Sequence, residues 1–288
     1  MPQFSRRSHA ATAMAGRRVL ITGASGGIGA ATAAAMRRLG ATVIGIDLVA
    51  APPDVLAADV RDVEAVQAAV DEAAKRMGGI DILVNGAGVG VANDAGAFPD
   101  AAARRVLDIN LLGTWTASAA ALPHLLHSRG HVVNIASGLA FVTVPFAVAY
   151  TASKRAVTAY SDTLRMEYRG RISVSTVYPG YIRTAIHEAP AAQGVSLEGA
   201  VPAETVENVA ATIIRACVGR KRDLATGRST AAGLFLGRHA PALMDRLVAR
   251  GFEKRFRNRA RPAFLRRFDT ETPDVLSAPR AAPPGPNR

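Results

Sequence analysis

Short apolar runs recur along the first two thirds of the chain, and they show no alternation of polar and apolar residues. Unbroken runs of this kind are typical of parallel strands that are buried on both faces of a sheet. They predict five strands, with a weaker sixth candidate at residues 55–59. The five ranges are 19–22, 42–47, 80–85, 131–136 and 172–178.

Longer segments with apolar residues at helical spacing separate these runs. They predict four helices, at residues 27–39, 63–77, 101–127 and 149–169. A glycine follows each of them within three residues. Helices commonly end in a residue with the left-handed conformation, which glycine adopts with the least strain. The alternation of strands and helices predicts an α/β fold, a doubly wound parallel sheet in a single domain.

The chain has 288 residues, of which 49% are hydrophobic, enough for one sizeable core and an appendage. The single Cys217 excludes an internal disulfide framework and a multi-cysteine site, and we expect no metal. Charged residues, Gly or Pro break every apolar stretch before the roughly 20 residues of a membrane span. Residues 1–15 lack the apolar core of an export signal, so we expect a disordered leader and a cytoplasmic protein.

The charge is unevenly placed along the chain. Residues 1–214 hold 18 Lys or Arg against 17 Asp or Glu, whereas residues 215–288 hold 17 against 6. Most of the net charge of +12 therefore lies in the last quarter, and the body is nearly neutral. The basic segment resembles no nucleic-acid recognition motif and is interleaved with bulky aliphatic residues, so no nucleic-acid partner is expected.

A glycine-rich stretch at residues 22–29 joins the first predicted strand to the first helix, at the sheet edge where ligands of this fold bind. Gly23 allows a sharp turn, Gly27 removes a Cβ from the path of a pyrophosphate, and Gly29 lets the helix lie close to the sheet. The amides of the first helical turn then face the anion. Taken alone, the pattern also fits an ordinary strand-to-helix turn.

Asp47 ends the second predicted strand, 18 residues after Gly29. A carboxylate there can accept hydrogen bonds from both hydroxyls of an adenosine ribose, and it would repel the additional phosphate of NADP. Leu48 follows it, and the turn carries Ser25 and no Arg or Lys, so the sequence favours NAD. The alternative for Asp47 is a solvated strand end.

Tyr150 and Lys154 lie four residues apart on a predicted helix and project from the same face. A lysine ammonium beside a phenol favours the phenolate and lowers the pKa of the tyrosine from about 10 toward working pH. Such a pair also occurs by chance on the surface of many helices. The neighbouring motifs decide between the two interpretations.

These motifs occur in a fixed order. Asn85-Gly86-Ala87-Gly88 closes the third long strand, Asn110 falls in a long helix, Ser137 precedes Tyr150 by 13 residues, and Pro179-Gly180 follows the last strand. With the glycine turn and the Tyr150–Lys154 pair, they make residues 16–227 resemble the short-chain dehydrogenase/reductase family in its common single-domain form. Gly86 departs from the pattern, because many relatives have a second Asn there.

The resemblance implies a Rossmann fold over residues 16–230 and four catalytic residues. Tyr150 would be the general acid or base on the substrate oxygen, and Ser137 would hydrogen-bond that oxygen. Lys154 would hold the nicotinamide ribose hydroxyls as well as tune Tyr150, and Asn110 would position a water of a proton relay. The bland alternatives are a helix cap for Ser137 and a polar kink residue for Asn110.

The resemblance also implies a set of cofactor-binding positions. The glycine turn and Ile28 would lie along the pyrophosphate, and Asp59 and Val60 would lie beside the adenine. The segment after the predicted strand at residues 172–178 would wrap the nicotinamide end, with Thr184 near the phosphates. The full set is Gly23, Ser25, Gly27, Ile28, Gly29, Asp47, Asp59, Val60, Asn85, Ala87, Gly88, Tyr150, Lys154, Pro179, Gly180, Ile182 and Thr184.

Substrate class is indicated by two segments, residues 139–146 and a lid at about 185–203. The first is apolar, and His187, Glu188 and Glu198 are the ionisable residues of the second. Apart from Arg183 beside the lid, neither segment offers a cation to clamp a carboxylate or phosphate. We therefore expect an apolar pocket for a hydrophobic secondary alcohol or its ketone.

Residues 231–269 are expected to form a basic amphipathic helical extension, and residues 270–288 a disordered tail. Pro241 can start a helix. The apolar stripe that follows fits packing on a second subunit, a cover over the active site, or peripheral contact with an anionic membrane. Its members are Leu243, Met244, Leu247, Val248, Phe252, Phe256, Phe264, Leu265 and Phe268.

Two classes of function stay open at this level. The first is an NAD-dependent oxidoreductase, and the second is a non-catalytic dinucleotide sensor or scaffold of the same fold. A sensor has no need of the complete set of four catalytic residues. The resemblance further implies a homodimer or homotetramer that assembles through the long helices carrying Asn110 and Tyr150.

Overall fold

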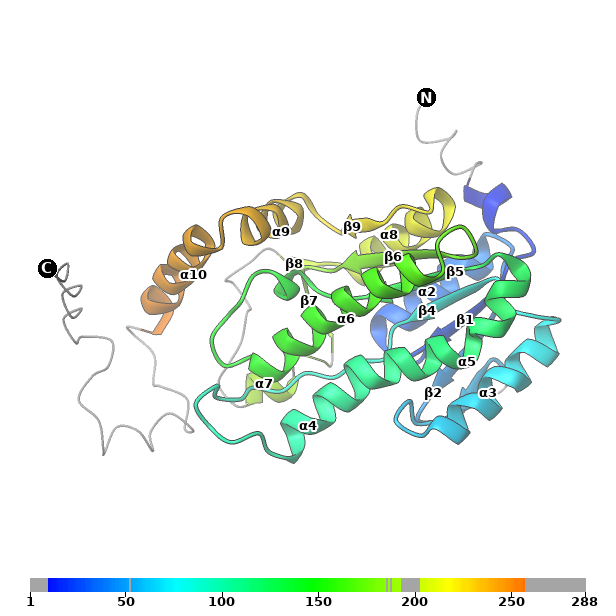
Figure 1. The fold of residues 1–288 in the computed structure, drawn as a ribbon, viewed down its shortest axis with the longest axis horizontal. Coiled ribbons are helices and arrows are strands. Elements are labelled where there is room, and N and C mark those ends of the chain that lie inside the picture. Colours follow the sequence, from blue (N-terminus) through cyan, green and yellow to red (C-terminus); the bar gives the residue numbers. More distant parts are fainter. Residues whose placement is uncertain (1–9, 52, 185, 187, 193–202, 257–288) are drawn as a thin grey trace, which may run out of the picture.

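A seven-stranded sheet forms the centre of the chain in the computed structural model, which describes residues 10–51, 53–184, 186, 188–192 and 203–256. All strand pairs are parallel, in the order β3-β2-β1-β4-β5-β6-β9 (Figure 1). The order reverses direction between β1 and β4, which makes the carboxyl ends of these two strands the switch point of a doubly wound sheet. The strands are β1 Arg18–Thr22, β2 Thr42–Asp47, β3 Val55–Ala57, β4 Ile82–Asn85, β5 His131–Ile135, β6 Ser173–Tyr178 and β9 Asp223–Ala225.

Helices cover both faces of the sheet (Figure 1). Two of them, α2 and α8, pack on one face with Val19 and Ile21, whereas α3, α5 and α6 pack on the other face with Leu20. Alternate residues of one strand thus enter two separate cores, which is why the strands are apolar throughout. The helices are α2 Gly27–Arg38, α3 Val63–Met77, α4 Ala101–Leu107, α5 Gly113–Ser128, α6 Val148–Glu167, α7 Glu188–Ala192 and α8 Val206–Gly219. The predicted α/β fold is confirmed.

Several elements differ from the prediction. The strand predicted from residue 80 begins at Ile82, and the Asp81 carboxylate just before it accepts hydrogen bonds from the backbone and guanidinium of Arg18. The helix predicted over residues 101–127 contains one turn of π-helix, η1 Asp108–Leu112, between α4 and α5. The sequence analysis did not identify α8, β9 or the two-stranded ladder of β7 Tyr181–Ile182 with β8 Ala203–Glu204.

The N-terminal segment is a correction to the sequence analysis. Residues 10–14, assigned there to a disordered leader, are helical, and the side chain of Met14 is only 1% exposed. It packs in the core between the sheet and α2, in contact with the cluster that contains Met36. Burial of a long apolar side chain explains why this turn is ordered.

Two helices form the described part of the C-terminal extension, α9 Arg228–His239 and α10 Pro241–Phe256. The extension therefore begins three residues before the predicted residue 231, and the predicted helix start at Pro241 is confirmed. In Figure 1, α9 and α10 lead away from the β9 edge of the sheet. Met244 is buried, whereas Leu243 and Leu247 are about half exposed. The expectations for residues 257–288 lie outside the described residues, as do those for His187 and Glu198.

Within the described residues, no helix is long and apolar enough to cross a membrane.

Candidate active site

The glycine-rich turn leaves β1 at the switch point and enters α2. Gly23 has a φ of +69°, and a Cβ on it would lie 2.7 Å from the backbone of Ala87. A Cβ on Gly29 would overlap the carbonyl oxygen of Gly23. Both glycines are therefore required by the tightness of the turn itself and by its contact with the segment after β4.

The same turn fits the phosphates of a dinucleotide. The Gly26 N-cap gives α2 no side-chain hydrogen bond, whereas Asp62 and Thr205 cap α3 and α8. The first-turn N–H groups of α2 are thus left for another acceptor, such as an anion. A Cβ on Gly27 would lie 3.2 Å from Cγ2 of Thr184. The turn and Thr184, both expected near the phosphates, are therefore neighbours in the structure.

Asp47 stands beside this turn at the end of β2. Its carboxylate accepts hydrogen bonds from the backbone N–H of Ser25 at 2.8 Å and of Leu48 at 2.8 Å. These contacts hold its carboxylate against the start of the glycine turn.

Asp59 and Val60 occupy the next strand end, after β3. Asp59 forms an ion pair with Arg61 at 2.5 Å, and the hydrogen bonds from this guanidinium lower the pKa of the carboxyl group. Val60 is buried against Gly113, on which a Cβ would lie 2.6 Å from Cγ2 of Val60. Val60 thereby packs the segment after β3 against the start of α5.

Asn85 has a different place from the one expected. Its side chain is buried inside the sheet layer, where Nδ2 donates to Ser118 at 2.8 Å and to Asn134 at 2.8 Å. The amide thus fastens β4 to β5 and α5 and does not point out of the sheet edge. Ala87 and Gly88 do lie at that edge, and a Cβ on Gly88 would lie 3.4 Å from Nζ of Lys154.

Asn110 lies in the π-helical turn η1 and is fully buried. Its side chain makes two hydrogen bonds with the backbone of Val89, at 2.8 and 3.0 Å, and a third with Ser153 at 3.0 Å. The Asn110 amide therefore joins the segment after β4 to the helix that carries Tyr150. Turns of π-helix inside α-helices are frequent at functional sites, which agrees with a role here.

Ser137 follows β5, and its hydroxyl accepts a hydrogen bond from the Leu139 N–H at 3.1 Å. It therefore caps the short 3-10 helix η2 Gly138–Ala140, which is the structural role considered above as the alternative to catalysis. Ser137 also lies close enough to Tyr150 to lower the pKa of its phenol. The cap therefore does not remove Ser137 from the neighbourhood of the phenol.

The surroundings of Lys154 and Tyr150 do not give the pKa shift that was expected for Tyr150. Its ammonium donates to the Ile135 carbonyl at 3.0 Å and lies 5.8 Å from the Tyr150 ring centroid, over the ring face. Burial raises the pKa of Tyr150, and only the Ser137 hydrogen bond opposes it. Burial also lowers the pKa of Lys154 to about 8. The pKa of Tyr150 is therefore raised and not lowered as predicted, because desolvation of the phenol is the largest influence on it.

The segment after β6 closes the site. The Pro179 carbonyl accepts a hydrogen bond from the Gly138 N–H at 2.8 Å, which ties it to the serine segment. Gly180 donates to Thr226 at 3.1 Å, and Ile182 is buried in β7. Pro179, Gly180, Ile182 and Thr184 therefore form one wall that runs from Ser137 to the glycine turn.

Three groups that orient the side chains and backbone of this site were not predicted from the sequence. Ser153 orients Asn110, the Ile135 carbonyl holds Lys154, and Thr226 anchors Gly180. No motif marks them, since a serine beside a lysine and a backbone carbonyl carry no spacing signal. Among the described residues, no group of three His, Cys, Asp or Glu side chains could hold a metal ion.

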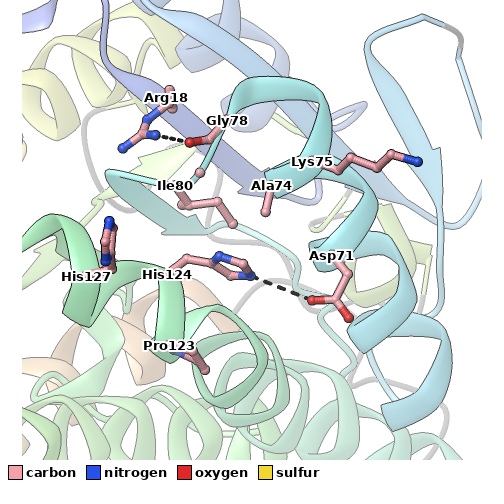
Figure 2. A pocket seen from close by; sticks show the side chains of 10 residues that line it. Arg18, Asp71, Ala74, Lys75, Gly78, Ile80, Pro123, His124 and His127 are labelled. Carbon is pink, nitrogen blue, oxygen red and sulfur yellow. Dashed lines mark hydrogen bonds and ion pairs between the residues drawn. The ribbon is translucent and has the colours of Figure 1, made fainter.

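A cavity of about 480 Å³ lies elsewhere, between α3 and α5. Figure 2 shows His124 pointing toward Asp71, at 3.6 Å, and Arg18 pointing toward the Gly78 carbonyl. Arg18 begins β1, and Ile80 precedes β4. The cavity is therefore at the amino ends of the strands, opposite the edge that carries Ser137 and Tyr150, and it contains none of the predicted site residues.

Known proteins of related sequence match most of this chain. The dehydrogenase/reductase SDR family member 7B of Xenopus laevis is 35% identical over 214 residues, which are 70% of this chain and 65% of that protein. The L-fucose dehydrogenase of Bos taurus is 37% identical over 63% of this chain and 72% of that protein. The chain thus spans about two thirds of the length of these curated relatives.

A solved structure covers more of the chain, and a family profile matches its first two thirds. A short chain dehydrogenase from Burkholderia cenocepacia, crystallised in complex with NADP, is 26% identical and superposes with a TM-score of 0.71 over 82% of this chain and 99% of that one. The profile described as short chain dehydrogenase matches residues 17–193, which contain every predicted catalytic residue. Together with the geometry of the strand ends, these matches show that the chain belongs to the short chain dehydrogenase (SDR) family of oxidoreductases.

Proposed function

We propose that the protein is an NAD-dependent oxidoreductase that interconverts a hydrophobic secondary alcohol and its ketone, with Tyr150 as the general acid or base. The observation that carries this proposal is the position of Ser137 beside Tyr150, whose phenol pKa it lowers, next to the glycine turn that suits a dinucleotide. A sensor would need the turn alone. The complete and connected set of Asn110, Ser137, Tyr150 and Lys154 favours catalysis.

Each of these residues has a task in the proposed reaction. A bound nicotinamide dinucleotide supplies the carbon that exchanges hydride with the substrate. In oxidation, the Tyr150 oxygen takes the proton of the alcohol, and in reduction it returns that proton to the carbonyl oxygen. Ser137 donates a hydrogen bond to the same oxygen. Lys154 provides a nearby positive charge, and Asn110 holds the helix of Tyr150 against the segment after β4.

The preference for NAD rests on Asp47. Its carboxylate, fixed by Ser25 and Leu48, would hydrogen-bond a ribose diol and repel a 2′-phosphate. The related enzyme in complex with NADP makes the opposite preference a real alternative. Initial rates with each cofactor in turn distinguish the two.

Asp47→Ala is expected to reduce the preference for NAD over NADP by about tenfold, equivalent to about 1.4 kcal/mol. The variant loses the ribose acceptor and, at the same time, the charge that repels a phosphate. The ratio of kcat/KM for the two cofactors measures the change. Asp54→Ala is the matched control, because Asp54 is a nearby exposed carboxylate that precedes β3 and pairs with Arg37. An unchanged ratio in Asp47→Ala would contradict the assignment.

The proposed substrate class rests on the segment that follows Ser137. Val142, Val144 and Phe146 are all partly exposed there, and they offer an apolar wall to a substrate. A sugar or polyol is the second candidate, because the relative from Bos taurus is named L-fucose dehydrogenase. A panel of hydrophobic secondary alcohols and of sugars tests both, and faster turnover of sugars would overturn the first.

We also propose that two copies of the chain assemble through the outer faces of α5 and α6. Large apolar side chains are exposed there, including Trp115 at 56% and Met166 at 77%. The Trp115 ring lies 5.5 Å from that of Tyr160, so the two helices present one continuous apolar surface. Exposed apolar surface of this kind marks an interface with another molecule.

Trp115→Glu is expected to convert the assembly to monomers, because it places a charge at the centre of this surface. Analytical ultracentrifugation of the wild type and the variant measures the change. Phe98→Glu is the control, since Phe98 is 96% exposed and lies on neither helix. Equal sedimentation of wild type and Trp115→Glu would refute this interface.

A further inference from the structure

Helix α9 packs directly on the segment that carries Ser137. A Cβ on Gly237 would overlap the carbonyl oxygen of Phe141, so the helix backbone and this segment touch without side chains between them. One turn earlier, a Cβ on Gly233 would lie 3.2 Å from Val142. Gly138, next to Ser137, approaches Thr230 in the same way, at 3.2 Å. The contact therefore runs along the whole first half of the segment after Ser137.

The Phe141 ring is held by two arginines from different helices. The guanidinium of Arg238, in α9, lies 4.4 Å from the ring centroid, and that of Arg155, in α6, lies 5.5 Å from it. A guanidinium at this distance from an aromatic ring is attracted to it by about 0.5 to 2 kcal/mol. Phe141 also contacts Tyr178 of β6, with ring centroids 6.2 Å apart. The ring is thus fixed between α9, α6 and the sheet.

The start of α9 is tied to the opposite wall of the site. Thr230 donates a hydrogen bond to the Glu204 carboxylate at 3.0 Å. A Cβ on Gly180 would lie 2.6 Å from the same carboxylate oxygen. The Pro179–Gly180 turn, β8 and α9 therefore meet at Glu204, and no side chain larger than glycine fits at position 180 without moving them.

We propose that α9 is a positioning element of the active site, in which Gly237 and Arg238 hold the Ser137 segment at the distance from Tyr150 that catalysis requires. This inference rests on the proposed function of Ser137 and Tyr150. The helix reaches the serine through Phe141 and reaches the Pro179–Gly180 turn through Glu204. It gives the C-terminal extension a role in the reaction although none of its residues touches the reacting atoms.

The first test replaces Gly237 with Ala, which forces α9 and Phe141 apart. We expect kcat to fall at least tenfold with little change in KM for the cofactor, because the glycine turn is not involved. Gly251→Ala is the matched control: it is the same substitution in α10, where a Cβ would meet nothing within 4 Å, and it should retain full activity.

The pH profile separates positioning from a general loss of stability. The Ser137 hydrogen bond lowers the pKa of Tyr150, so displacement of Ser137 should move the ascending limb of alcohol oxidation to higher pH. Lys154 is the charged group facing Tyr150 among the described residues, and the other residues packed on Tyr150, such as Val89 and Val106, are apolar. The same limb in Gly251→Ala should stay in place.

Arg238 provides a second variant that leaves the backbone packing intact. Arg238→Ala should lower kcat in the same direction, and Arg238→Lys, which keeps a cation over the ring, should restore most of it. Hydrogen exchange of the unligated protein gives a readout without turnover: amides of residues 137–142 should exchange faster in Gly237→Ala and Arg238→Ala than in Gly251→Ala.

Two results would overturn the inference. One is wild-type kcat and an unmoved pH limb in both Gly237→Ala and Arg238→Ala. The other is equal hydrogen exchange of residues 137–142 in all variants. A wild type that turns over no substrate would count against the proposed function, whereas the exchange experiment would still decide whether α9 holds the serine segment.

Discussion

Tyr150→Phe is expected to lower kcat by about 1,000-fold while the protein still binds NAD. A general acid or base in the transition state contributes typically 100- to 10,000-fold, and phenylalanine keeps the ring but removes the group that carries the proton. The hydroxyl of Ser137 then loses its partner, but it keeps the cap to Leu139, so the segment stays in place. Initial rates and a separate titration of NAD binding measure the two effects.

Tyr160→Phe is the matched control for this variant. Tyr160 lies on the same helix, burial also raises the pKa of its phenol, and a nearby serine, Ser118, opposes that shift. Its ring lies against that of Trp115 in α5, and it is not one of the four proposed catalytic residues. We expect Tyr160→Phe to keep wild-type turnover. Equal activity of wild type and Tyr150→Phe would instead remove Tyr150 from the mechanism.

The fold and the glycine turn could be predicted because they depend on local sequence. A parallel strand buried on both faces must be apolar at every position, as Val19, Leu20 and Ile21 are. A turn in which one residue has a φ of +69° and another would place its Cβ on a carbonyl oxygen requires glycine at both positions. Such requirements are written in the residue types themselves.

The elements that were missed depend on tertiary contacts. Strand β9 has only three residues, Asp223–Ala225, and becomes a strand because β6 is available to pair with it. Met14 is ordered because the core between the sheet and α2 accepts it. In both cases the local sequence looks the same as that of a loop or a disordered leader, so it does not predict the element.

The motifs predict which residues meet at the strand ends, but not which hydrogen bonds their side chains form. The motifs identify Asn85, Tyr150 and Lys154, but not the direction in which each side chain points. Asn85 turns inward to Asn134, and Lys154 turns to the Ile135 carbonyl. The sign of a pKa shift depends on such directions and on burial, which a spacing of four residues does not contain.

Lys154→Met is expected to reduce kcat at least 100-fold and to change how stability depends on pH. The ammonium is 95% buried, and burial lowers its pKa from 10.5 to about 8. Below pH 8 the group is protonated in both the folded and the unfolded protein, and the folded state bears the full cost of the buried charge, on the order of 3 kcal/mol. Between pH 8 and 10.5 the unfolded chain binds more protons, so the stability of the wild type rises with pH.

The methionine variant lacks this titration, and its stability should therefore not share the rise. Its Ile135 carbonyl loses the hydrogen bond of 3.0 Å, a cost of about 1 to 3 kcal/mol that does not vary with pH. Denaturant unfolding of both proteins at pH 7.5 and pH 10 measures the difference, in which all other titrating groups cancel. We expect the wild type to gain at least 2 kcal/mol on the variant over this range, by the same linkage. A difference that is independent of pH would mean that Lys154 is not held as a buried ammonium, and its place beside Tyr150 would need another explanation than charge.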